Sequence, residues 1–412
     1  MKNIIKRLGP GLIAGASDDD PSGIGTYTQA GAAFGFATLW TAIITLPLMI
    51  VVQHICAKIG MCAGTGLAGV LREHYPRWLL YPVVLGLFAA NSINIGTDIA
   101  AMAAAINLFV PIPVTVLSIP IAVALAALMI LGSYRLIVRV FKWLALSLFA
   151  YVAAAFLARP DWSAVAYSTF VPHITLSAEF MTTIVAILGT TISPYLFFWE
   201  ADQEVEDEKS IGRKSEAERQ GATDLELKNE KIDTVTGMVF CNVVFYFVIL
   251  SAGATLHVNG HTHIESAAEA ALALRPLAGE LATVLFAVGL LGAGLLAIPV
   301  LSGSAAFAVS EAMGWRSGLD EKPASAKKFY AVIAISTIAG IGINFAGIEP
   351  ITALFWTAVI NGLVAPPLLV VVMLVSNDRR VMGDRVNGRW ANLIGWLAAA
   401  IMFAAAAGMF LS

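Results

Sequence analysis

Long apolar runs recur along this chain from residue 9 to its last residue, and they limit how it can fold more than any other feature. The hydrocarbon core of a bilayer is about 30 Å thick, so a helix that crosses it needs roughly 20 predominantly apolar residues. With 58% hydrophobic and 13% charged residues, the 412-residue chain is too apolar for a water-soluble protein. We therefore predict an all-α polytopic membrane protein with eleven spans, at residues 9–35, 37–59, 79–109, 113–132, 141–158, 178–199, 234–256, 277–311, 329–346, 350–375 and 391–411.

The Lys and Arg residues test this topology independently. If the N-terminus is cytoplasmic, 23 of the 25 basic residues fall in segments on the cytoplasmic side, and only Arg159 and Arg275 fall outside. Cytoplasmic loops of membrane proteins carry such an excess of basic residues. The basic N-terminus and the short apolar stretch after it are similar to a signal peptide, but three aspartates follow at once, so we expect the stretch to remain as a half-helix. We predict a cytoplasmic N-terminus and a C-terminus outside.

The one long polar insert is residues 200–233, which hold 12 acidic and 6 basic residues. We interpret it as a charged cytoplasmic loop, solvated and helical at most in part. The alternative is a regulatory metal site made by Glu204, Glu206, Asp207 and Glu208, although consecutive acids on a mobile loop bind divalent ions only loosely.

Ionisable residues inside a membrane span are costly and are therefore candidates for function. The outstanding group lies in the middle of span one and reads Asp18-Asp19-Asp20-Pro21-Ser22-Gly23. Proline removes a backbone donor and clashes with the preceding turn, and glycine tolerates the torsions of an unwound segment. We predict that span one is broken here into two half-helices, whose free carbonyls and a carboxylate form an oxygen-rich cation site.

Span six carries a matching interruption. Its middle reads Gly189-Thr190-Thr191-Ile192-Ser193-Pro194-Tyr195, with a proline among small polar residues. Spans one and six are the first spans of two five-span sets, and paired breaks at matching positions are the best sequence indication of a transport site.

The span-one residues resemble the first helix of the Nramp family of divalent metal transporters. The similar stretch is GPGLIAGASDDDPSGIGTYTQAGA, beginning at Gly9, and the similarity continues through Gly96-Thr97-Asp98-Ile99-Ala100 and span six. The resemblance implies a leucine-transporter-like fold in a single transmembrane domain, residues 1–412. Its two inverted five-helix repeats would cover residues 1–158 and 178–375, with residues 391–411 as an eleventh, additional helix.

Several positions depart from the family pattern. Asp20 and Pro21 match the Asp-Pro of the family's Asp-Pro-Gly-Asn motif, but the asparagine ligand falls at Gly23. The family's Met-Pro-His in span six becomes Ser193-Pro194-Tyr195, so the thioether ligand is replaced by a hydroxyl. The Ser-Pro-Tyr-Leu-Phe-Phe-Trp stretch is similar to the Nramp-related magnesium transporters, and we expect the chain to belong to that branch.

The chemistry of these replacements indicates a hard ion. Hydroxyl, carbonyl and carboxylate oxygens suit Mg²⁺ and Mn²⁺, whereas a thioether favours softer transition metals. Magnesium sheds water reluctantly and binds through one or two carboxylates while keeping several waters. We expect transport of divalent cations, Mg²⁺ and also Mn²⁺, by alternating access through an oxygen-lined midplane site.

The expected ligands are Asp20, Gly23, Thr190 and Ser193. Asp20 supplies the essential carboxylate, Thr190 a main-chain carbonyl, Ser193 a hydroxyl, and Gly23 a carbonyl or simply room. Consecutive helical residues are about 100° apart, so the three aspartates cannot all face one ion. Residues expected around the ligands, in the inner vestibule or against coordinating water, are Asp18, Asp19, Tyr195 and Asn361.

Asp98 retains one member of the acid pair that the family uses for proton transfer, while its partner falls at Ala101 and a family histidine falls at Trp199. The relay therefore looks interrupted, and we expect transport without proton coupling. The alternatives are a proton-coupled Mn²⁺/Fe²⁺ symporter of the ordinary Nramp kind and a sodium-coupled small-solute transporter on the same fold. Three acids at the break disfavour an anionic substrate for the latter.

Other functions are less well supported. A net charge of −3 gives no indication of a nucleic-acid partner, and no Walker motif, nucleophile elbow or HExxH suggests an enzyme. A metal-capture site formed by His257, His261 and His263 lacks a fixed third ligand. We expect a bacterial plasma (inner) membrane protein with no cofactor, the divalent ion being its substrate and the lipid bilayer its surroundings; no oligomeric state is indicated.

Overall fold

The computed structural model describes residues 14–15, 17–131, 146–319 and 321–412, and every regular element within them is helical. By length and composition, seven described helical segments are able to cross a membrane, and α7 is a shorter apolar helix. The prediction of an all-helical membrane protein is confirmed. The long helices are α3 (Pro21–Phe34), α4 (Trp40–Ala63), α6 (Arg77–Asn107), α7 (Val114–Leu131), α11 (Ala178–Thr191), α12 (Pro194–Ser210), α14 (Asp224–Ala252), α17 (Ala282–Met313), α18 (Lys327–Ile343), α19 (Pro350–Val375) and α21 (Arg389–Leu411).

Shorter helices lie between and beside them, and several of these were not predicted. The span prediction missed α5 and α10 because neither is long enough to cross a bilayer. Parts of spans one, four and five, residues 9–13, 16, 132 and 141–145, lie outside the described residues. The short elements are α5 (Leu67–His74), η1 (Leu146–Phe149), α9 (Ala150–Leu157), α10 (Trp162–Phe170), α13 (Glu216–Arg219), the π-turn η2 (Gly253–His257), α15 (Ala267–Ala271), η3 (Leu272–Leu274), α16 (Arg275–Ala278), η4 (Gly279–Leu281), α20 (Arg379–Met382) and η5 (Gly383–Arg385).

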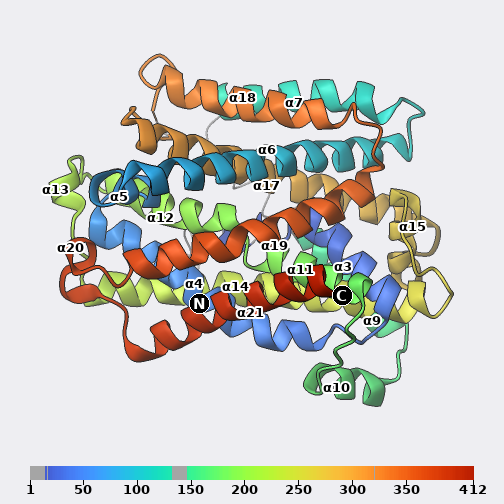
Figure 1. Ribbon diagram of the computed structural model, residues 1–412. Helices are drawn as coiled ribbons and strands as arrows, with labels where there is room; N and C mark the ends of the chain where they lie inside the picture. The colour runs from blue at the N-terminus through green and yellow to red at the C-terminus, as the bar shows by residue number, and fades with distance from the viewer. Residues whose placement is uncertain (1–13, 16, 132–145, 320) are drawn as a thin grey trace.

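The helices form a bundle, and α3 lies inside it with other helices around it (Figure 1). Helix α6 packs along α17 and α18 on one side, whereas α4, α14 and α21 lie on the other. Helix α3 contacts α14, α19, α11 and α6, so the broken part of span one is enclosed on all these sides. Helices α5, α13 and α20 lie at one end of the bundle, and α10 and α15 lie at the opposite end.

The segment 200–233 is partly helical, as the prediction allowed, but it is not solvated throughout. Helix α12 continues to Ser210 and α14 begins at Asp224 with a capping box between Thr223 and Glu226. Six of the twelve acidic residues of the segment are buried, because they lie on the faces that α12 and α14 turn toward the bundle. The connection between them is tied to α4, since the Arg219 guanidinium donates to the carbonyl of Gly64 at 2.9 Å.

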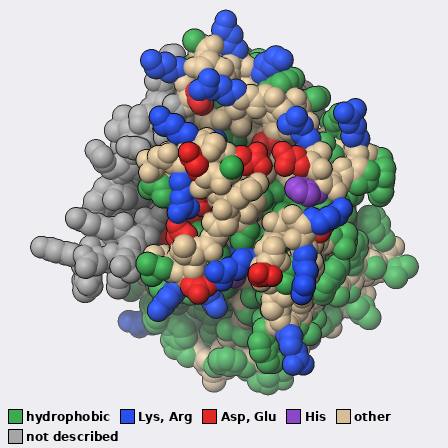
Figure 2. Space-filling model, turned by 90° about the vertical axis from the view of Figure 1, so that its left-hand side faces the viewer, with side chains coloured by type: hydrophobic (Ala, Val, Ile, Leu, Met, Phe, Trp, Pro, Cys, Tyr) green, Lys and Arg blue, Asp and Glu red, His purple; other side chains and the backbone are tan. Residues whose placement is uncertain are grey.

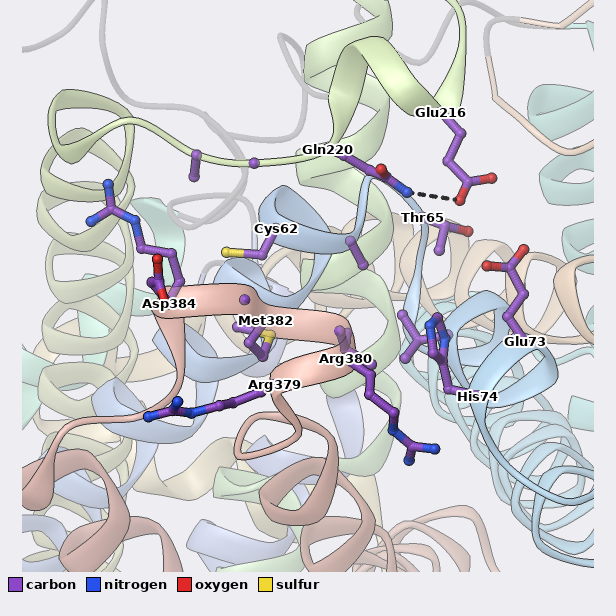
Figure 3. A pocket seen from close by; sticks show the side chains of 17 residues that line it. Cys62, Thr65, Glu73, His74, Glu216, Gln220, Arg379, Arg380, Met382 and Asp384 are labelled. Atoms are coloured by element: carbon purple, nitrogen blue, oxygen red, sulfur yellow. Dashed lines mark hydrogen bonds between the residues drawn. The ribbon is translucent and has the colours of Figure 1, made fainter.

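Charged side chains gather at the end of the bundle that carries α5, α13 and α20 (Figure 2). Lys and Arg side chains spread around this end, and Asp and Glu side chains lie closer to its centre. A pocket of about 490 Å³ at the same end is lined by residues of α4, α5, α13 and α20, among them Cys62, His74 and Arg379 (Figure 3). Its charged side chains largely point away from one another. The placement of this end on the cytoplasmic side remains a prediction.

Glycines bring α11 and α19 unusually close together. A methyl group added at Gly189 would lie 2.1 Å from the carbonyl oxygen of Ala358 and 2.2 Å from the amide nitrogen of Gly362. Helices in membranes approach one another closely where both carry small residues. This contact fixes the last turn of α11, which carries the second helix break.

Candidate metal site at two helix breaks

The first break lies where span one was expected to unwind. Asp19 sits in a bend, Asp20 is extended with φ −70° and ψ 170°, and α3 begins at Pro21. The Oδ1 atom of Asp20 accepts hydrogen bonds from the amide of Gly23 and the hydroxyl of Ser22, both at 2.7 Å. Asp20 therefore caps α3. Pro21 occupies the first helical position, where its missing backbone N–H costs no hydrogen bond, because an N–H at that position has no partner within the helix.

The second break lies beside the first. Helix α11 ends at Thr191, Ser193 is extended, and α12 begins at Pro194, as predicted. The Ser193 hydroxyl donates to the carbonyl of Thr190 at 2.9 Å and lies 3.4 Å from Oδ1 of Asp18. The Tyr195 hydroxyl donates to the carbonyl of Ser17 at 3.0 Å, and this bond ties the two breaks together.

Gly23 and Thr190 face each other across the two breaks. A methyl group added at Gly23 would lie 3.1 Å from the Thr190 hydroxyl and 3.5 Å from the carbonyl of Asp18. The structure thus brings together Asp18, Asp20, Gly23, Thr190 and Ser193 in one buried region, as the sequence led us to expect. Their roles as ligands remain predictions.

Asn94 of α6 is a residue of this region that the sequence reasoning missed. Its amide nitrogen donates to Oδ2 of Asp20 at 2.8 Å and lies 3.3 Å from Oδ2 of Asp98. The amide nitrogen of Asn361, on α19, donates to the Asn94 oxygen at 3.4 Å. The missed signal is a polar stripe at helical spacing, Asn91-Asn94-Asp98, inside an apolar span.

Cys241 of α14 is the second missed residue. Its thiol lies 3.1 Å from Oδ2 of Asp18 and 3.4 Å from Oδ1 of Asp19. Asp18 and Asp19 thus face α14, whereas Asp20 faces α6. A single cysteine within an apolar span gives no sequence signal of such a contact, which depends on how α14 packs against the first break.

The four carboxylates of this region, Asp18, Asp19, Asp20 and Asp98, are each at most 2% exposed. Within the part of the chain that the structure describes, no Lys, Arg or His forms an ion pair with any of them. Oδ2 of Asp19 and Oδ1 of Asp98 have no hydrogen-bond partner. A buried carboxylate without a counter-charge is costly, so this arrangement favours the binding of a cation.

The donors differ from those of a compact protein-only metal cage. Among the described residues, no three His, Cys, Asp or Glu side chains converge on one point as direct ligands. An ion here would therefore complete its shell with hydroxyls, main-chain carbonyls and water.

The chain matches a family model described as Nramp, natural resistance-associated macrophage protein-like, over residues 11–412. It belongs to the Nramp family. The chain is 26% identical to the divalent metal cation transporter MntH of Bacillus subtilis (strain 168), covering 98% of this chain and 91% of that protein. It is also 26% identical to MntH of Pectobacterium carotovorum subsp. carotovorum (strain PC1), covering 95% and 90%.

Solved structures confirm the fold of this Nramp protein. The Eremococcus coleocola manganese transporter superposes with a TM-score of 0.76 at 18% identity, covering 98% of this chain and 86% of that one. Mhp1, a nucleobase-cation-symport-1 family transporter, superposes with a TM-score of 0.61 at 13% identity, covering 98% and 92%. The predicted leucine-transporter-like fold is confirmed.

Ala101 and Trp199, where the resemblance led us to expect an interrupted relay, are both buried. Ala101 and Trp199 have no exposed surface, and the Trp199 ring lies against Gly303, where an added methyl group would approach it to 2.7 Å. The ring of His257, the last residue of η2, contacts the carbonyl of Ala32 at 2.8 Å. The described residues contain no cluster of His, Cys, Asp or Glu there that could hold a metal ion, so the structure gives the capture site no support.

Proposed function

We propose that this protein transports divalent metal cations across a membrane by alternating access through the region between the two helix breaks. The observation that carries the proposal is the set of four buried carboxylates at these breaks, which have only neutral hydrogen-bond partners among the described residues. Relatives over nearly the whole chain are named divalent metal cation transporters. Asp20 is the main charged ligand in this proposal, because it lies at the unwound junction and faces Asn94 of α6.

Mg²⁺ and Mn²⁺ are the proposed substrates, and with them the proposal assigns the chain to the Nramp-related magnesium branch. The oxygen atoms of Asp20, Thr190 and Ser193 are hard donors, and Ser193 stands where the family has a methionine. The Cys241 thiol contacts Asp18 and Asp19 rather than Asp20. A site that retains the ion's water has less need of the soft ligand that selects transition metals.

The proposed transport is not coupled to protons. Asp98 contacts Asn94 at 3.3 Å, while the positions of the family's other relay residues are the buried Ala101 and Trp199. A proton that reached Asp98 would meet no titratable side chain at either position. The competing function is a proton-coupled Mn²⁺/Fe²⁺ symporter, which is favoured by the unpartnered Oδ1 of the buried Asp98.

Proteoliposome uptake distinguishes these functions. Uptake of Mg²⁺, Mn²⁺, Ca²⁺ and Cd²⁺ would be recorded together with internal pH, for the parent protein and for Asp98→Asn. We expect Mg²⁺ and Mn²⁺ uptake without internal acidification, and we expect Asp98→Asn to retain it. Metal-driven acidification that disappears in Asp98→Asn would establish the symporter instead, and strong preference for Cd²⁺ over Mg²⁺ would refute the hard site.

A further inference from the structure

An apolar groove lies on the outside of the bundle, where α6, α17 and α18 meet. Its volume is about 710 Å³, which falls within the roughly 300–1,000 Å³ of ligand-binding clefts. Among the described residues that line it, Lys328 is the one charged side chain, and all the others are apolar or aromatic. None of the residues at the two helix breaks lines this groove, so it is separate from the candidate metal site.

The walls of the groove are made of exposed apolar side chains. Leu85 of α6 is 68% exposed and Ile335 of α18 is 56% exposed. The lining extends from Tyr81 to Phe88 on α6 and from Lys328 to Ile335 on α18, which is about 10 Å along each helix. One leaflet of the hydrocarbon core is roughly 15 Å thick, so the groove matches most of the length of one acyl chain.

Basic and aromatic side chains lie at one end of the groove. Lys328 belongs to the first turn of α18, and its Nζ atom lies 4.7 Å from the centre of the Trp315 ring. Arg77 is the first residue of α6 and lies one turn before Tyr81, on the same face of that helix. Helix α6 directly follows α5, so this is the end of the bundle where Lys and Arg side chains gather (Figure 2).

The positive charges at this end of the groove have no protein counter-charge. Neither Lys328 nor Arg77 forms an ion pair with an acidic residue in the described part of the chain. Glu321, in the connection between α17 and α18, is instead paired with Arg316 at 2.8 Å. The face of the Trp315 ring attracts the Lys328 ammonium but carries no net charge. A ligand with a negative group beside a hydrocarbon chain would complement this arrangement.

We propose that the groove binds one anionic phospholipid, whose acyl chain lies along α6 and α18 and whose phosphate contacts Lys328. Charge complementarity favours this occupant, because the end of the molecule that holds Lys328 is the one predicted to face the cytoplasmic leaflet, which carries anionic lipids. A zwitterionic lipid offers the same hydrocarbon, but the positive charge of its own headgroup opposes Lys328. The inference goes beyond transport and does not depend on which ion is carried.

Native mass spectrometry of the purified full-length protein tests the site. The protein would be delipidated in detergent and titrated with phosphatidylglycerol or with phosphatidylcholine that carries the same acyl chains. We expect one phosphatidylglycerol to bind roughly fivefold more tightly than phosphatidylcholine, since a single lysine near the membrane surface contributes about that factor. Lys328→Gln should remove this preference while leaving phosphatidylcholine binding unchanged.

The matched control for the charge is Lys327→Gln. Lys327 is also exposed, but it lies about 100° around the helix from Lys328 and does not line the groove, so this variant should keep the preference. Ala331→Trp fills the groove and should weaken the binding of both lipids. Ala339→Trp, at an exposed position of the same helix outside the groove, should weaken neither.

Thermal unfolding without added lipid checks that each variant folds. Phosphatidylglycerol should then raise the Tm of the parent and of Lys327→Gln more than that of Lys328→Gln, because a ligand stabilises the folded state in proportion to its binding. This comparison needs only the two lysine variants, so it decides the question even if Ala331→Trp does not fold.

Equal binding of the two lipids to the parent protein would overturn the proposal, and so would a preference that persists in Lys328→Gln. A stable dimer that Ala331→Trp dissociates would also overturn it, since a second copy of the chain would then occupy the groove.

Discussion

The close approach of α11 and α19 makes Gly189→Ala a sharp test of the structure. The added methyl group would lie 2.1 Å from the Ala358 carbonyl oxygen and 2.2 Å from the Gly362 nitrogen, where ordinary contact begins at 3.4 Å. Both atoms belong to the backbone of α19, so no side chain can rotate away. The helices must separate by about 1 Å, and such overpacking costs roughly 1–3 kcal/mol.

Helix propensity acts in the opposite direction, because alanine is favoured over glycine in a helix by about 1 kcal/mol. We expect the steric cost to win and the free energy of unfolding to fall by about 1–2 kcal/mol, since rigid backbone favours the upper part of the steric range. Gly86→Ala in α6 is the matched control, because nothing lies within 4 Å of its added methyl group. It should be neutral or stabilising by up to about 1 kcal/mol.

Thermal unfolding of the purified protein, followed by tryptophan fluorescence, should therefore show a lower Tm for Gly189→Ala and an unchanged or higher Tm for Gly86→Ala. Gly362→Ala should behave like Gly189→Ala, since its methyl group would lie 2.3 Å from the carbonyl oxygen of Val185. Metal uptake should also fall in Gly189→Ala, because its neighbour Thr190 belongs to the second break. A Tm for Gly189→Ala equal to or above that of Gly86→Ala would refute the described contact.

Substitutions at three further positions test the region between the breaks. Asn94→Ala removes a hydrogen-bond donor 2.8 Å from Asp20. Because such a bond to a charged group contributes about 1.5–3 kcal/mol, we expect the Mg²⁺ affinity measured by uptake to change by roughly tenfold or more. Unchanged affinity would contradict the role of Asn94. Ser193→Met adds a soft donor, so competition assays should show Cd²⁺ gaining on Mg²⁺, and an unaltered ratio would place Ser193 away from the ion. Cys241→Ser keeps a donor toward Asp18 and should preserve uptake, whereas Cys241→Ala should reduce it; equal uptake by the two variants would show that this contact does not matter.

Local sequence signals were sufficient for both helix breaks and for the spans that the structure describes as single long helices. Residues 350–375 were predicted as one span, and α19 covers Pro350–Val375. The breaks before Pro21 and Pro194 were predictable because proline limits the backbone at its own position and at the preceding residue. These effects act within a few residues, so no knowledge of tertiary contacts is needed.

The residues that were missed depend on contacts between distant segments. Cys241 meets Asp18 only because α14 packs against the first break, and the sequence separation is 223 residues. The helical insert was misjudged for a related reason: its high charge suggests solvation, but Glu204 and Glu208 lie on a helix face that packs inward. Asn94 is the exception, since its polar stripe was present in the sequence of span three.

Mg²⁺ uptake by Asp20→Asn in proteoliposomes tests the central claim most directly. The substitution keeps the shape of the side chain but removes its charge at the unwound junction, while Glu280→Gln, at an exposed position, serves as the charge-matched control. We expect uptake by Asp20→Asn to fall to the level of protein-free liposomes and uptake by Glu280→Gln to match the parent. Parent-like uptake by a folded Asp20→Asn protein would contradict the account.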